Sequence, residues 1–326
     1  MLPPPVDRHT HLEGSLDPEW VRREAARLGI VIPDLTEAFW RGEARAPRAG
    51  GPLSSGQIFQ AFISTFVFAS GFLTSREAVQ GALGAAVARL APPESDHPRG
   101  IDLWVSPHWL VRERRQISLE DLWAGLELGR EDALRQGVHV AVVIDAVNHF
   151  GPAHGQEVLD LVLGDLPPWV VGFSTGGMEQ VPFREWAPVF RRAKSAGLRL
   201  AAHAGENGPG SNVRDAILEA GVERIVHGVK AAEDPALLEL LAEQRIPVDV
   251  CITSNFALVP GLKLHPLRRF LEAGVRCGLG TDDPGVMRCD LPGEWHHALA
   301  MGLSEGAAQR LRAQSVEDAW CFQIGT

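Results

Sequence analysis

The sequence predicts a closed barrel of eight parallel strands alternating with helices, a (β/α)8 TIM barrel formed by residues 1–326 as a single domain. Short apolar runs alternate with segments of helical periodicity along most of the chain. Most of these runs are continuously apolar, which is typical of parallel strands covered on both faces. Eight such units within about 280 residues match the size and rhythm of a closed barrel.

A doubly wound open sheet is the structural alternative, because it shows the same alternation of strands and helices. Such sheets commonly carry a Gly-rich phosphate-binding turn after their first strand. No such turn follows the first apolar run, Val6–His11, and this disfavours the open sheet.

The individual elements follow from apolar runs and capping residues. The predicted strands are residues 6–11, 100–107, 139–147, 169–176, 199–206, 224–228, 247–255 and 276–284. The predicted helices are residues 118–136, 154–163, 183–196, 212–220, 235–244 and 264–273. Ser118 is suited to cap the first of these helices, and Gly197, Gly221 and Gly274 are suited to end three others.

A long, largely helical insertion is expected after the first strand, at about residues 18–91. Within it, residues 41–55 are rich in Gly, Pro and Arg, which is typical of a mobile loop. A loop at this place in the chain is suited to cover the mouth of the barrel. Further helices are expected at the C-terminal end.

The charge balance disfavours two classes of partner. There are 31 Lys and Arg against 41 Asp and Glu, a net charge of -10, whereas nucleic acid and acidic membrane surfaces require a basic face. No apolar stretch reaches the roughly 18–20 residues of a membrane span, and no basic-then-apolar leader opens the sequence. The four cysteines form no CxxC pair, which favours free thiols and a cytoplasmic protein. The sequence does not predict an oligomeric state.

Residues that can bind a metal or transfer protons occupy the carboxyl ends of four predicted strands. Such barrels place their active sites on this face. They are His9, His11, His203, Glu206, His227, Asp282 and Asp283. Alternate residues on a strand point the same way, so His9 and His11 direct two imidazoles to one point. Joined by His203 and Asp282, they form a donor set that suits zinc and leaves a position for water.

A zinc ion at this point would lower the pKa of its bound water towards about 7 and make hydroxide available at neutral pH. Glu206 lies three residues after His203, where the strand gives way to loop, and is placed to donate and accept protons. The remaining histidines fall in loops, at element starts or in helices. We expect His97, His139, His149, His154 and His265 to be solvated, and His296 and His297 to be helical.

Five segments, in this order, resemble the adenosine deaminase family of the amidohydrolase superfamily. They read DRHTHLEGSL, HAGE, RIVHG, CITSN and GTDDP, and the match runs from about Asp7 to about Val286. The resemblance implies a (β/α)8 barrel of the metal-dependent hydrolase type and one Zn²⁺ per chain. Its four ligands would be His9, His11, His203 and Asp282.

The resemblance also implies roles around the metal. Glu206 would protonate the purine ring at N1, and His227 would orient and help deprotonate the metal-bound water. Asp283 would share the hydroxide's proton and form a hydrogen bond with N7, and the backbone at Gly177 would meet N3. The implied reaction is addition of zinc-bound hydroxide to C6 of a 6-aminopurine, followed by loss of ammonia.

Two absences narrow the type of metal site. The fourth predicted strand ends Phe173-Ser174-Thr175-Gly176-Gly177, without the lysine or acid that commonly bridges two metals in this superfamily. The cytidine-deaminase type of zinc site needs a P-C-x-x-C pair that the chain does not contain. A single metal of the adenosine deaminase type is therefore expected.

The substrate is left open by departures from the family pattern. Adenosine-specific members often carry Asp where Glu13 stands, facing the sugar's 5′-hydroxyl, and Asp where Ser174 stands. We expect Glu13 to bind substrate, and Phe59 and Phe62 of the helix 57–68 to wall the apolar side of the pocket.

The first prediction is hydrolytic deamination of a 6-aminopurine nucleoside of the adenosine type. The alternatives are adenine and the 6-aminodeoxyfutalosine of menaquinone synthesis, whose benzoate an arginine would bind well. Candidate arginines are Arg45, Arg48, Arg112, Arg114 and Arg115. Another mononuclear metallohydrolase reaction is the more distant alternative. A binding module without catalysis is disfavoured by the complete metal and acid–base set.

Overall fold

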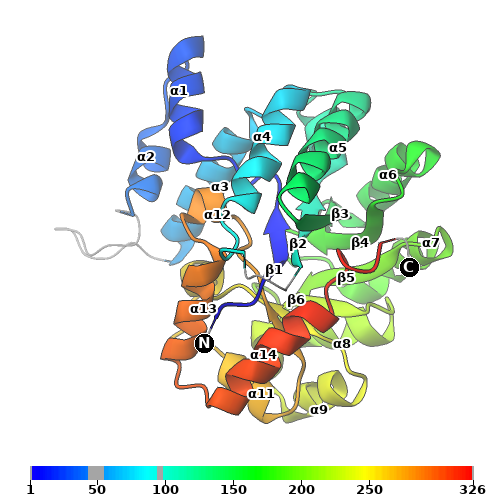
Figure 1. Ribbon diagram of the computed structural model, residues 1–326. Coiled ribbons are helices and arrows are strands. Elements are labelled where there is room, and N and C mark those ends of the chain that lie inside the picture. The colour runs from blue at the N-terminus through cyan, green and yellow to red at the C-terminus, as the bar shows by residue number, and fades with distance from the viewer. Residues whose placement is uncertain (1, 43–54, 94–97, 325–326) are drawn as a thin grey trace.

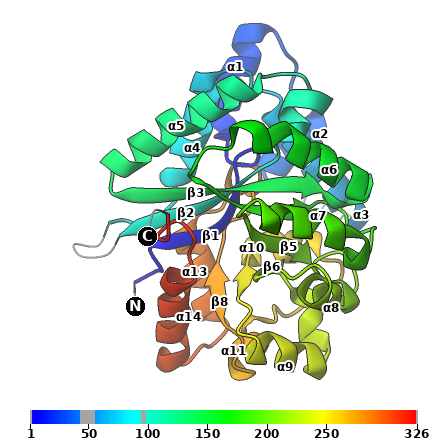
Figure 2. The same ribbon diagram turned by 90° about the vertical axis from the view of Figure 1, so that its right-hand side faces the viewer.

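The computed structural model describes residues 2–42, 55–93 and 98–324. Its eight strands run parallel and follow one another in chain order from β1 to β8 (Figures 1 and 2). The strands are β1 Val6–His11, β2 Arg99–Val105, β3 Val138–Val147, β4 Val170–Gly176, β5 Arg199–Ala204, β6 Arg224–His227, β7 Val248–Val250 and β8 Cys277–Leu279. The first and last strands meet beyond the end of β8, where His11 N donates to Asp282 O at 2.7 Å. The predicted (β/α)8 barrel is thereby confirmed.

Helices surround the strands on the outside of the barrel (Figure 2). Those of the alternating units are α5 Leu119–Arg135, α6 Gly151–Val162, α7 Phe183–Ser195, α8 Gly210–Leu218, α9 Pro235–Glu243, α10 Ile252–Leu258 and α11 Leu267–Glu272. Shorter helical turns are Trp109–Glu113, Asn148–Phe150, Leu163–Asp165 and Val229–Glu233. As expected, Ser118 caps α5 by accepting the N–H of Asp121.

The insertion predicted between the first two strands is helical. It consists of α1 Pro18–Leu28, α2 Asp34–Trp40, α3 Ser55–Ser70 and α4 Arg76–Val87, and α3 contacts α10. The predicted loop 41–55 lies almost wholly outside the described residues, as does His97. The C-terminal helices are α12 Pro284–Met287, α13 Leu291–Ala300 and α14 Glu305–Glu317.

The prediction for the seventh strand is wrong at its carboxyl end. Residues 247–255 were expected to be extended, but only Val248–Val250 is a strand, and α10 begins at Ile252. The carboxylate of Glu294, from α13, accepts the backbone N–H groups of Ile252 and Thr253 at the start of this helix. Such an acceptor satisfies first-turn N–H groups that have no partner within the helix.

The eighth strand is also shorter than predicted. It ends at Leu279, and residues 284–287, the start of which was expected to be strand, form α12. Asp282 adopts a positive φ of 62°, a backbone conformation incompatible with a continuing strand. This turn directs the Asp282 side chain towards the histidines of β1.

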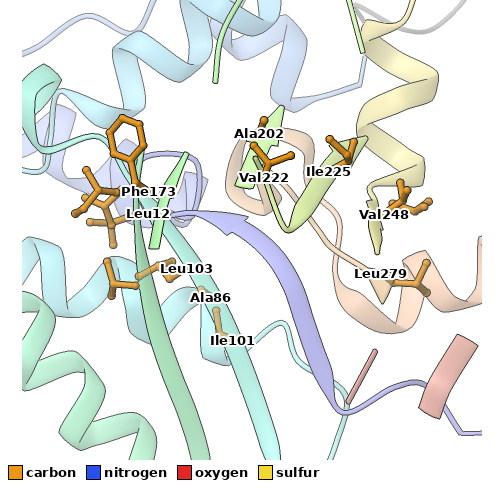
Figure 3. Close-up of a cluster of buried hydrophobic side chains, with 14 of the residues drawn as sticks. Leu12, Ala86, Ile101, Leu103, Phe173, Ala202, Val222, Ile225, Val248 and Leu279 are labelled. Atoms are coloured by element: carbon orange, nitrogen blue, oxygen red, sulfur yellow. The ribbon is translucent and has the colours of Figure 1, made fainter. Parts of the chain in front are cut away.

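The strands are buried on both faces. On β3, Val140, Val142 and Ile144 belong to the cluster that packs beneath the helices, whereas Ala141 and Val143 belong to a separate cluster. Figure 3 shows apolar side chains of the larger cluster carried by several strands, among them Ile101, Leu103, Phe173, Ala202, Ile225, Val248 and Leu279. This double burial explains the continuously apolar strands in the sequence.

A buried network of charges also links the strands. Arg8 of β1 pairs with Asp249 of β7 at 2.8 Å, and Arg224 of β6 pairs with Asp102 of β2 at 2.7 Å; all four side chains are inaccessible to solvent. Asp102 also accepts the backbone N–H groups of Trp320 and Cys321, which follow α14. The segment after the last helix is therefore part of the barrel's packed structure.

No helix in the described part of the chain combines the length and apolar character needed to cross a bilayer. All four cysteines are free thiols, as expected.

Candidate metal centre and active site

Three imidazole nitrogens and one carboxylate oxygen converge at the carboxyl end of the barrel. The Nε2 atom of His9 lies 3.2 Å from that of His11 and 3.1 Å from that of His203, and 3.1 Å from Asp282 Oδ1. His11 and His203 bring their Nε2 atoms to 3.2 Å from each other. Atoms this close on four separate side chains can share one cation, and nitrogen with oxygen donors in this number suit zinc.

Burial keeps the three imidazoles in the form that binds metal. It lowers the pKa of His9 and of His11 to about 3 and lowers that of His203 well below its usual value. Each ring is therefore neutral at physiological pH and has a nitrogen lone pair to offer. The described residues fit the metal that the sequence predicts.

The backbone and a second carboxylate hold these donors in place. His203 donates from Nδ1 to the carbonyl of Thr175 at 2.7 Å, which leaves the Nε2 lone pair free to face the cluster. Asp7 accepts the N–H of His9 and both the N–H and the hydroxyl of Thr281. Asp7 thus joins the first strand to the turn that carries Asp282.

Glu206, His227 and Asp283 lie beside the metal donors. The Nε2 atom of His227 is 3.7 Å from the Oε2 atom of Glu206. Burial raises the pKa of Glu206 to about 7, and burial together with the charge of Asp282 raises that of Asp283 well above its usual range. A Cβ atom at Gly14 would overlap the Asp283 side chain, so the glycine after Glu13 makes room for this carboxyl group.

A cavity of about 350 Å³ opens over this group. It is lined by nine of the site residues predicted from the sequence, namely His11, Phe59, Phe62, Gly177, His203, Glu206, His227, Asp282 and Asp283. Phe66, Trp109 and Leu258 add apolar surface. Its size is that of a small-molecule site, with few polar groups against apolar walls.

Glu13 lies behind the wall of this cavity. Its carboxylate is fully buried and accepts the N–H of Ser106 at 2.7 Å, and it is Ser106 that faces the cavity. Burial raises the pKa of Glu13 to about 7. Its role in binding substrate remains a prediction.

No arginine or lysine lines the cavity among the residues that the structure describes. Arg112 and Arg115 line a different surface cavity, and Arg114 lies over the ring of Trp109 at 5.8 Å. Arg45 and Arg48 lie outside the described residues.

Asp145 lies at the site but was not predicted from the sequence. This side chain of β3 pairs in register with Ser174 of β4 and lines the cavity beside His11 and His203. Burial raises its pKa well above the usual range. The signal was an acid within the apolar run 139–147, since a parallel strand buried on both faces has little reason to carry one.

Glu179 supports the site and was likewise not predicted from the sequence. Its carboxylate accepts the N–H groups of Gly205, Glu206, Asn207 and Gly208 at 2.7–3.2 Å. This single side chain gathers the loop that carries Glu206, and no local pattern announces a contact across 26 to 29 residues.

The expectation of solvated histidines is wrong for two of them. His154 and His265 are only 6% and 7% exposed. The ring of His154 packs edge-on against that of His108 at 4.7 Å. His265 forms hydrogen bonds with Asn255 and with the backbone of Leu267. A ring from a distant segment contacts His154, whereas the contacts of His265 come from residues 10 and 2 positions away.

Known proteins resemble this chain over nearly its whole length. The family model described as Adenosine deaminase matches residues 4–324. An adenine deaminase of Ralstonia nicotianae is 31% identical over 96% of this chain and 89% of its own. An adenosine deaminase of Escherichia coli is 28% identical over 97% of this chain and 93% of its own.

Solved structures share the fold. An adenine deaminase from Arthrobacter aurescens superposes with a TM-score of 0.81 at 24% identity, covering 99% of this chain and 97% of its own. A zinc-bound amidohydrolase from Burkhoderia ambifaria superposes with a TM-score of 0.79 at 22% identity, covering 98% of this chain and 86% of its own. The chain therefore belongs to the adenosine deaminase family, whose members are hydrolases that act on C–N bonds.

Proposed function

We propose that this protein removes the 6-amino group of an uncharged 6-aminopurine nucleoside of the adenosine type by hydrolysis, with one Zn²⁺ per chain. The observation that carries the proposal is the convergence of four metal donors beneath a cavity that Glu206, His227 and Asp283 share. His9, His11, His203 and Asp282 would hold the metal. Bound there, Zn²⁺ would lower the pKa of a coordinated water towards about 7 and so supply the nucleophile.

The protein's own groups then act on the purine. As oxygen adds to C6, negative charge builds on the ring, and Glu206 neutralises it by giving its proton to N1. A pKa of about 7 leaves Glu206 substantially protonated near neutral pH. The raised pKa of Asp283 suits donation of a hydrogen bond to N7. The proton of the added hydroxyl passes to the amino group as the C6–N bond breaks, so ammonia leaves and the 6-oxo product forms.

The walls of the cavity favour an uncharged substrate. A phosphate or a benzoate would need a cationic partner, and none lines the cavity among the described residues. This supports adenosine or adenine over 6-aminodeoxyfutalosine. The aromatic side chains of α3 offer apolar area to a flat base.

Free adenine is the second candidate substrate. Glu13, the residue expected to meet a sugar hydroxyl, is fully buried and is not among the cavity's lining residues. The 31% identical relative from Ralstonia nicotianae is an adenine deaminase, which also favours this candidate.

The test is to incubate zinc-loaded protein with adenosine, adenine and 6-aminodeoxyfutalosine separately, measuring ammonia and the loss of adenine absorbance. We expect turnover of adenosine or adenine and none of the third compound. A Glu206→Gln protein with the same zinc content is the control for adventitious activity. If none of the three releases ammonia while zinc is bound, the proposal is wrong and another metallohydrolase reaction takes its place.

We also propose a small-molecule aminopurine as the partner, with no nucleic acid or membrane, and a cytoplasmic location. The net charge of -10 supports the absence of a nucleic-acid or membrane partner. The four free thiols support the cytoplasmic location.

A further inference from the structure

His227 is joined to a chain of buried side chains on the face turned away from the cavity. Its Nδ1 atom lies 2.9 Å from Asn255 Nδ2 of α10. The Oδ1 atom of the same asparagine lies 3.0 Å from His265 Nε2, and His265 Nδ1 lies 3.1 Å from the backbone nitrogen of Leu267. Asn255 is inaccessible to solvent and His265 is 7% exposed, so water does not compete for these contacts.

The contact between Leu267 and His265 determines which atom donates in each of the other hydrogen bonds. The backbone nitrogen of Leu267 can only donate, so His265 Nδ1 accepts and carries no proton. Burial lowers the pKa of His265 to about 3, so the ring is neutral and its one proton is on Nε2. This proton is donated to Asn255 Oδ1.

The orientation of Asn255 then sets the proton on His227. With Oδ1 accepting from His265, the amide nitrogen of Asn255 faces His227 and donates to Nδ1. A neutral His227 therefore carries its proton on Nε2, the atom that points to Glu206. The partner of one ring nitrogen determines the state of the other.

The neighbouring strand shows the opposite arrangement. His203 donates from Nδ1 to the Thr175 carbonyl, so its Nε2 offers a lone pair to the metal site. His227 lies in the same cluster, together with His9, His203 and Asp282, close enough to count as a further metal ligand. At Nδ1, His203 meets a carbonyl that accepts, whereas His227 meets an amide that donates. This difference makes His203 suited to bind the metal and His227 suited to donate a hydrogen bond.

We propose that Asn255 and His265 are positioning residues that hold His227 as the Nε2–H tautomer, so that it donates a hydrogen bond into the cavity and stays out of the metal's ligand set. The inference refines the proposed function, because the oxygen that attacks the purine would accept this hydrogen bond. Because the Nε2–H group of His227 is already oriented, it would need no reorganisation during the reaction. In this assignment His227 stabilises the nucleophile and does not take its proton.

The first test measures the tautomer itself in the zinc-loaded full chain. Protein labelled with ¹⁵N-histidine, with His227 assigned by comparison with a His227→Gln variant, reports which ring nitrogen is protonated. We expect Nδ1 of His227 to be unprotonated and Nε2 protonated. A proton on Nδ1 at neutral pH would overturn the proposal. This result needs no substrate, so it stands apart from failure of the deaminase assignment.

The second test inverts the chain of hydrogen bonds with a nearly isosteric change. In Asn255→Asp the carboxylate can only accept, so His227 must place a proton on Nδ1 to keep the contact. We expect the ¹⁵N spectrum to show this proton, and kcat to fall about 10–100-fold with KM near the wild-type value, as when outer-shell partners are lost. Asn255→Asp with an unchanged His227 spectrum and wild-type kcat would contradict the proposal.

His265 provides a rescue experiment. His265→Gln keeps a donor for Asn255 Oδ1, whereas His265→Phe removes it, so the glutamine variant should retain more activity and the wild-type tautomer. His296→Gln, on the exposed face of α13, is the matched control and should change neither. Equal loss in both His265 variants, with the His227 tautomer unchanged, would show a merely structural role and overturn the proposal.

Discussion

Burial changes the chemistry of single carboxyl groups at the carboxyl end of this barrel. Glu206 is 8% exposed, and removal from water raises its pKa to about 7. An exposed glutamate would be ionised at that pH and could not protonate a purine ring. A proton donor is most effective when its pKa lies near the working pH, so the position of Glu206 is suited to the reaction.

The pH dependence of the enzyme follows from this pKa. Glu206 is protonated below about pH 7 and loses its proton as the pH rises through that value. We therefore expect kcat/KM to decline on the alkaline side of about pH 7, measured at constant zinc content. Glu206→Gln should lower kcat by about 10²–10⁴-fold and abolish this decline. An alkaline decline that persists in Glu206→Gln would assign it to another group.

At the scale of elements, buried carboxylates fasten neighbouring segments of the active site to each other. Asp7 joins β1 to the turn after β8, and Glu294 joins α13 to the start of α10. Glu179 joins the segment after β4 to the loop after β5. Each contact satisfies backbone N–H groups that would otherwise be buried without partners. Side-chain carboxylates, and not the hydrogen bonds of a helix or sheet, thereby hold in place the loops that carry the reactive residues.

Glu179→Gln tests this role of a buried carboxylate. The amide keeps the volume but leaves one acceptor oxygen for four backbone N–H groups, so the loop with Glu206 should shift. We expect about a 10–100-fold loss of kcat and a loss of about 1–3 kcal/mol in the free energy of unfolding. Denaturant titration and steady-state kinetics measure the two effects. Glu185→Gln, exposed on α7, is the control, and equal behaviour of both variants would refute the role.

The sequence allowed the barrel and its metal donors to be predicted because both depend on local patterns. His9 and His11 share a strand face, and His203 and Asp282 end other strands, so topology alone brings them together. The end of the seventh strand was mispredicted because the carboxylate that starts α10 comes from Glu294, 42 residues away. The burial of His265 was not predicted either, and its partner Asn255 belongs to α10, 10 residues before it. Pairwise contacts of this kind leave no periodic signal.

At the scale of the whole molecule, four buried charges on four strands form one network. Arg8, Asp102, Arg224 and Asp249 are all inaccessible to solvent, and Arg224 also lies 4.0 Å from the centre of the Trp320 ring. Such a network is stable only when complete, because each charge is buried against its partner. It therefore ties β1, β2, β6 and β7 to one another and to the segment after α14.

Asp102→Ala tests the network. Two buried arginines and two backbone N–H groups would lose a partner, so we expect the free energy of unfolding to fall by about 3–5 kcal/mol. Urea denaturation followed by circular dichroism measures this change. Asp165→Asn, exposed outside the barrel, should change stability by less than about 0.5 kcal/mol. A similarly small effect at Asp102 would show that the network contributes little.

Removing the metal should affect activity and stability together. A ligand that binds only the folded chain stabilises it by about 2.7 kcal/mol at 100 times its Kd. We therefore expect a chelator to abolish deamination and to lower Tm, and added Zn²⁺ to restore both. Unchanged deamination by protein shown to be free of metal would refute the metal site.

The contacts of Asp102 with Trp320 and Cys321 also bear on how the protein is made. Strand β2 leaves the ribosome some 218 residues before the backbone N–H of Trp320 that its aspartate must meet. The nascent chain must therefore carry Arg8 and Asp102 through most of synthesis before Asp249 and Trp320, their later partners, are made. Stable closure of this barrel is expected to follow translation of residue 321, so the half-made protein depends on protection from aggregation until then.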